Sequence, residues 1–100
     1  MKNILLVCGT GASSGFMARN LSKAAKTQGY DFTIRARSQS ELEDYIEEVD
    51  LVLVGPHFKH MFAGIKKVCE EYDVPTEIID EDAYGELDGE AVLAAVLKYV

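Results

Sequence analysis

Apolar and polar positions change their period along the chain, and this change predicts strands and helices in alternation. Residues 4–7 and 51–54 are apolar at every position, as expected of strands that are covered on both faces of a sheet. Residues 32–37 alternate between apolar and polar side chains, which is typical of an edge strand. Residues 74–79 form a short run of mixed apolar and polar residues. We therefore expect four strands, two central and two at the edges.

Between these strands, apolar side chains recur every three or four residues, which predicts amphipathic helices. The first helix is expected to end at Gly29, and the second to begin at a capping box formed by Ser40 and Glu43. The segment from residue 80 to 88 is expected to be an acidic loop. The predicted inward-facing positions are Met17, Leu21, Ala24 and Ala25; Leu42, Tyr45, Ile46 and Val49; Phe58, Met61, Phe62, Ile65, Val68, Cys69 and Tyr72; and Val92, Leu93, Val96 and Leu97.

Alternating strands and helices predict a parallel sheet with right-handed crossovers. If the apolar strands are central, the strand order is 2-1-3-4, with helices on both faces of a three-layer α/β domain. One hundred residues suffice for one such domain, 1–100, and are too few for two. Open α/β sheets bind ligands at a switch point at the carboxyl ends of their strands. Here that point lies between strands one and three, whose following loops begin at Cys8 and Gly55.

The bulk composition indicates a soluble, acidic domain. Hydrophobic residues make up 48% of the chain, and seventeen acidic against ten basic residues give a net charge of -7. We expect no basic patch, and therefore neither nucleic acid nor an anionic membrane as a direct partner. No apolar run is long enough to span a membrane, and the N-terminus lacks the features of a secretory signal. A cytoplasmic monomer without metal or cofactor is expected.

The segment from Cys8 to Gly15 joins a buried strand to a helix and holds only small residues after the thiol. Backbone N–H groups at a helix N-terminus bind phosphate, and glycines keep such a concavity open. The same donors favour the thiolate form of a cysteine. Cys8 is therefore predicted to be a nucleophile for a phosphoryl group. The predicted phosphate-binding residues are Gly9, Thr10, Gly11, Ala12, Ser13 and Ser14.

Other functions of this loop are disfavoured because their sequence motifs are absent. The dinucleotide pattern G-x-G-x-x-G is absent, and no lysine follows the glycines as in a nucleotide-binding loop. A low-molecular-weight tyrosine phosphatase needs an arginine six residues after its cysteine, where this chain has Ser14. Nor is there an obvious Asp-Pro general acid. A carrier of phosphoryl groups is favoured over a phosphatase, and a plain tight turn stays open on these residues alone.

Three segments resemble the enzyme IIB components of the sugar phosphotransferase system, of the lactose/cellobiose (chitobiose) type. The first strand and the loop after it resemble that family's phosphocysteine loop, at Cys8, Gly11, Ser13 and Ser14. Residues 51–61 resemble its third strand and Gly-Pro turn, and residues 78–89 resemble its C-terminal segment. Gly15 departs from the serine or threonine often found there. The resemblance covers nearly the whole chain.

The resemblance implies a phosphoryl relay. Cys8 would accept the group from a phosphohistidine of a IIA partner, with residues 9–14 as its cradle. It would then pass the group to a sugar, of the β-linked disaccharide class, bound by a membrane IIC partner. Two other functions remain: a stand-alone thiol phosphatase or arsenate-reductase-like enzyme on the same fold, and a regulatory module that binds phosphate without covalent chemistry.

Several other side chains invite a functional interpretation. Cys69 lies on the apolar stripe of its helix and is expected to be a packing thiol. His57 and His60 form H-x-x-H without an evident third metal ligand, and His57 either borders the phosphate or lies on the surface. Tyr84 either lines the rim of the site or packs. Solvated surface is expected for Glu70, Glu71, Asp80, Glu81 and Asp82. Arg35 and Arg37 are expected on the outer face of an edge strand.

Overall fold

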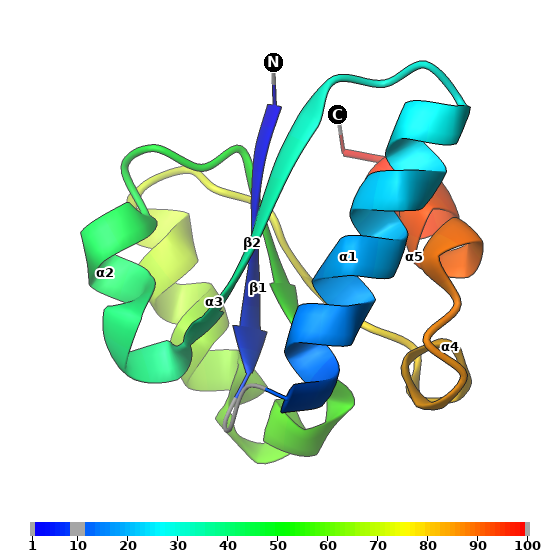
Figure 1. Ribbon diagram of the computed structural model, residues 1–100. Coiled ribbons are helices and arrows are strands. Elements are labelled where there is room, and N and C mark those ends of the chain that lie inside the picture. The colour runs from blue at the N-terminus through cyan, green and yellow to red at the C-terminus, as the bar shows by residue number, and fades with distance from the viewer. Residues whose placement is uncertain (1, 9–11, 100) are drawn as a thin grey trace.

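The computed structural model describes residues 2–8 and 12–99, without the side chains of residues 8, 12–14, 57 and 58. Strands and helices alternate along the described chain (Figure 1). The strands are β1 (Lys2–Cys8), β2 (Phe32–Ser38), β3 (Leu51–Val54) and β4 (Thr76–Ile78). The helices are α1 (Ala12–Thr27), α2 (Leu42–Tyr45), α3 (Phe62–Glu71), α4 (Glu81–Gly85) and α5 (Gly89–Val96), with 3-10 turns η1 (Gln39–Glu41) and η2 (Pro56–Met61).

The sheet is parallel and its strand order is β2-β1-β3-β4, which confirms the predicted order. Figure 1 shows α1 and α5 on one face of the sheet and α2 and α3 on the other. Successive residues of the central strands point alternately to the two layers of helices. Ile4 and Leu6 of β1 pack with α1 and α5, whereas Leu5 and Val7 pack with α2 and α3. Burial on both faces explains why residues 4–7 and 51–54 are apolar throughout.

The buried residues of α1 match the inward-facing positions predicted from the sequence. Met17, Leu21 and Ala25 are almost fully buried. The chain leaves α1 through Gly29, whose φ of 85° lies in the left-handed region that favours glycine. In α5, Leu93 and Val96 are fully buried, as predicted.

Three local predictions are wrong. The capping box lies two residues earlier than expected, because the N–H of Ser38 donates to the carboxylate of Glu41 at 3.2 Å and a 3-10 turn precedes α2. Tyr72, predicted to face inward, is 44% exposed because it is the C-cap residue where α3 ends. The predicted acidic loop contains the short helix α4, whose N-cap Asp80 accepts a hydrogen bond from the N–H of Ala83 at 3.1 Å.

Candidate active site at the carboxyl ends of β1 and β3

Cys8 is the last residue of β1, and α1 begins only four residues later, at Ala12. Gly9, Thr10 and Gly11, three of the predicted cradle residues, lie outside the described residues. Ala12, Ser13 and Ser14 form the first turn of α1, so their backbone N–H groups are among the four that a helix leaves unpaired. That turn contains no acidic residue, so no side-chain carboxylate there offsets the positive end of the helix dipole. The backbone around Cys8 is therefore suited to an anion.

The turn after β3 lies directly beside the end of β1. The N–H of Gly55 donates to the carbonyl oxygen of Val7 at 3.1 Å, which extends the pairing of the two strands by one bond. Pro56 then begins η2. Gly55 is therefore a neighbour of the residue before Cys8, whereas residues 9–11 lie outside the described structure. On the other side, Cys8 is paired in register with Ser38 of β2, a neighbour that the sequence pattern did not single out.

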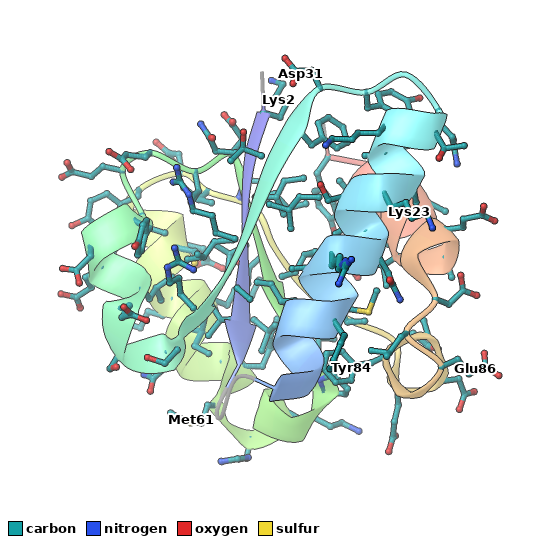
Figure 2. The ribbon with its side chains drawn as sticks, in the orientation of Figure 1. Lys2, Lys23, Asp31, Met61, Tyr84 and Glu86 are labelled. Carbon is teal, nitrogen blue, oxygen red and sulfur yellow. The ribbon has the colours of Figure 1, made fainter. Side chains whose placement is uncertain are left out.

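Tyr84 packs near the carboxyl ends of β1 and β3. Its side chain is only 5% exposed and belongs to the core between the sheet, α1 and α5. Figure 2 shows Tyr84 reaching from α4 toward the end of the sheet. A Cβ atom placed on Gly55 would lie 3.7 Å from the Tyr84 ring and 3.7 Å from the carbonyl oxygen of Val7. Of the two roles considered for Tyr84, packing is the one observed, and its ring fixes the turn at Gly55.

The H-x-x-H pair does not form part of a metal site in the described structure. His60 lies exposed in η2, and the side chain of His57 is outside the described set. Among the residues that the structure describes, no three His, Cys, Asp or Glu side chains are grouped to hold a metal ion.

A protein-family model described as "PTS system, Lactose/Cellobiose specific IIB subunit" matches residues 3–95. The chain belongs to this family. Such IIB components are phosphotransferase components that transfer phosphoryl groups to sugar. The family model spans β1 to α5, which agrees with the resemblance found at three separate segments of the sequence.

Curated relatives and solved structures agree with this assignment. The oligo-beta-mannoside-specific EIIB component of Bacillus subtilis is 31% identical, over 98% of this chain and 95% of its own length. A lactose-specific EIICB component of Lacticaseibacillus casei is 29% identical over 72% of this chain, which corresponds to 12% of that longer protein. The lactose-specific IIB domain of Streptococcus pneumoniae has the same fold, with a TM-score of 0.87 at 16% identity over 98% of this chain and 96% of its own.

The second thiol of this IIB component is a packing residue, as predicted. Cys69 is fully buried among the residues of β1, β3, α2 and α3. Burial raises the pKa of the Cys69 thiol, and a hydrogen bond with Thr76 opposes this effect in part. The thiol is therefore held in its neutral form, unlike a nucleophilic cysteine.

The expectation that this acidic IIB component has no basic patch is wrong. Arg19, Lys23 and Lys26 on α1 line one groove together with Arg35 and Arg37 on β2. The two arginines lie on an edge strand, as expected, and both are half-buried over the ring of Tyr45. Net charge did not reveal this groove, because its five cations come from two separate segments that only the fold brings together. In the described part of the chain, no helix is long and apolar enough to cross a membrane.

Proposed function

We propose that Cys8 is the residue of this IIB component that carries the phosphoryl group. A phosphohistidine of a IIA partner is the donor, and a sugar held by a membrane IIC partner is the acceptor. The observation that carries the proposal is the position of Cys8. It ends a central strand at the switch point of the sheet, beside a helix N-terminus without acidic residues.

The proposed relay consists of two displacements at phosphorus. The sulfur of Cys8 attacks, the bond between phosphorus and the imidazole nitrogen breaks, and the imidazole leaves with the bonding electron pair. In the second step a sugar hydroxyl oxygen attacks, its proton passes to a base, and the sulfur leaves as thiolate. In both steps the negative charge on the three peripheral oxygens is stabilised by N–H donors. We assign these donors to residues 9–14: Gly9, Thr10, Gly11, Ala12, Ser13 and Ser14.

Ser14 supports transfer over hydrolysis. It stands six residues after Cys8, where a low-molecular-weight phosphatase places a guanidinium that clamps the transition state. A carrier must accept and release its group with little change in free energy, so a weaker clamp suits it. We expect the isolated protein to hydrolyse p-nitrophenyl phosphate no faster than its Cys8→Ser variant. Measurable turnover that depends on Cys8 would favour the stand-alone thiol phosphatase or arsenate-reductase-like enzyme instead.

Phosphate transfer from a phosphorylated IIA protein tests the proposal directly. Intact-protein mass spectrometry should detect one added phosphate on the wild type and none on Cys8→Ser. Cys69→Ala is the matched control, because it removes the other thiol, which is fully buried, and it should still accept one phosphate. Anion binding that survives Cys8→Ala, without any phosphothiol in the wild type, would favour a regulatory phosphate-binding module.

We propose that the sugar is a β-linked disaccharide. The Bacillus subtilis relative is named for oligo-β-mannosides and the Lacticaseibacillus casei relative for lactose, both of which contain β-linkages. The latter name also combines IIC and IIB in one component, which supports a IIC partner for this chain. Deleting the gene should abolish phosphorylation-dependent uptake of a β-linked disaccharide and leave uptake of glucose unchanged. Loss of glucose uptake alone would refute this assignment.

A further inference from the structure

A basic groove lies between α1 and β2. It encloses about 750 Å³ and is lined by Arg19, Lys23 and Lys26 from α1 and by residues 34–37 of β2. It therefore contains five of the ten basic residues of a chain whose net charge is -7. No acidic side chain lines it. This concentration of one sign is suited to a negatively charged ligand.

The helix side and the strand side of the groove have similar lengths. From Arg19 to Lys26 the helix advances by about 10 Å, at roughly 1.5 Å per residue. From Ile34 to Arg37 the strand advances by about 10 Å, at roughly 3.3 Å per residue. The side chains of Arg19, Lys23 and Lys26 are exposed, and within the described chain they form no ion pair. An extended chain of about four residues would fit along this length.

The floor of the groove is the open edge of the sheet. β2 is the first strand in the order β2-β1-β3-β4, and Figure 1 shows α1 and α2 to either side of it, with none of the drawn helices lying across it. The N–H of Lys2 donates to the carbonyl oxygen of Asp31, so residues 31, 33, 35 and 37 of β2 face β1. The backbone groups of Ile34 and Ala36 therefore face the open side. In agreement, the Ala36 carbonyl accepts a bond of 2.8 Å from the side chain of Arg37.

We propose that this groove binds an extended acidic segment of another protein, which adds as a strand to the edge of β2. The N–H and carbonyl groups of Ile34 and the N–H of Ala36 would pair with the main chain of that segment, and the Ala36 carbonyl would pair with it when the Arg37 side chain turns to a carboxylate. Carboxylates on one of its faces would meet Arg19, Lys23 and Lys26, and those on the other face would meet Arg35 and Arg37. Main-chain pairing along β2 requires a polypeptide, which favours a peptide segment over nucleic acid or an anionic membrane as the occupant.

The cations of this groove are separate from the residues proposed for phosphoryl transfer. The α1 lining begins at Gly15, and its first basic residue is Arg19, seven residues into the helix from Ala12. The helix advances by about 10 Å over that distance, away from the end of β1 where Cys8 lies. Binding in the groove therefore requires no phosphoryl group and no reactive Cys8, so it can be tested by itself.

The experiment measures fluorescence polarisation of a labelled peptide of alternating Glu and Thr, about eight residues long. The test variant is Arg19→Glu with Lys23→Glu, and the matched control is Lys66→Glu with Lys67→Glu on α3, outside the groove. Both pairs are exposed helix positions and change the net charge equally. We expect the test variant to weaken peptide binding by about tenfold or more and the control by less than about threefold. A Gln-Thr peptide should not bind.

Strand addition predicts a second result, which is independent of the charge variants. In amide NMR spectra, the signals of Ile34 and Ala36 should shift on peptide binding and exchange more slowly with solvent. Equal weakening in both double variants would overturn the proposal, because only the overall charge would then matter. Unchanged amide signals on β2 would also overturn it, as would stronger competition for the groove by a single-stranded oligonucleotide or by phosphatidylglycerol vesicles than by the acidic peptide.

Discussion

Gly89→Ala is expected to destabilise the protein severely, because Gly89 lies where α5 approaches α1 most closely. A Cβ atom at Gly89 would press on the carbonyl oxygen of Asn20, 2.5 Å from the carbon of that carbonyl and 2.9 Å from the backbone nitrogen of Leu21. These are backbone atoms in the middle of α1, so no rotamer change relieves the clash. The side chain of Asn20 also holds the approach in place, since it donates to the carbonyl oxygen of Leu87 at 2.9 Å.

The magnitude follows from how far α5 must move. Restoring ordinary contact, at about 3.4 Å or more, requires a shift of roughly 1 Å, which separates Leu93 and Val96 from the core that they share with Met17 and Leu21. Overpacking of this kind costs about 1–3 kcal/mol of unfolding free energy. For a domain of 100 residues, this corresponds to a melting temperature lower by roughly 5–25 °C.

Urea denaturation followed by circular dichroism measures this difference. Gly64→Ala on α3 is the matched control, because a Cβ atom there meets nothing within 4 Å. That substitution should instead raise stability by about 0.5 kcal/mol through the higher helix propensity of alanine. The reasoning fails if Gly89→Ala unfolds within about 0.5 kcal/mol of the wild type, since α5 would then accommodate a side chain that the structure leaves no space for.

Three further predictions concern stability and thiol chemistry. Asp73 follows the end of α3 with a φ of 57°, so Asp73→Gly should raise the unfolding free energy by about 0.5–1 kcal/mol; a decrease in urea denaturation would contradict this. Burial raises the pKa of the Cys69 thiol. The buried neutral thiol therefore stabilises the fold fully below the unfolded thiol pKa of about 8.5, and this stabilisation is lost as pH rises above that value. Cys69→Ala should reduce the fall in unfolding free energy at alkaline pH, and an unchanged pH profile would argue against the raised pKa of Cys69. Tyr45→Phe removes the 3.0 Å hydrogen bond from Arg37 Nε but keeps the ring beneath the guanidinium. It should lower the unfolding free energy by at most about 1 kcal/mol in thermal denaturation. Tyr45→Ala also removes the ring and should lower the unfolding free energy by clearly more.

The sheet could be predicted from the sequence because its pattern is set by burial. Residues 4–7 and 51–54 are covered on both faces, which leaves no polar positions, whereas the edge strand β2 keeps Arg35 and Arg37. The strand order and the contact of Gly55 with Val7 at the ends of the two central strands follow from this difference. The hydrophobic pattern is therefore sufficient to predict which strands are central.

Features that depend on contacts between distant segments could not be predicted in this way. The basic groove combines residues of α1 and β2, and neither segment is unusual by itself. The packing of Tyr84 on Gly55 depends on α4, whose five residues carry too weak a period to distinguish a helix from an acidic loop. The capping box is ambiguous between Ser38 and Ser40, because both serines have a glutamate three residues later.

Peptide mapping of the phosphorylated protein decides whether Cys8 carries the phosphoryl group. After incubation with a phosphorylated IIA protein, we expect one phosphate in the wild type, located on the peptide that contains Cys8, and none in Cys8→Ser. Phosphate on another residue, or undiminished transfer to Cys8→Ser, would refute the role of Cys8.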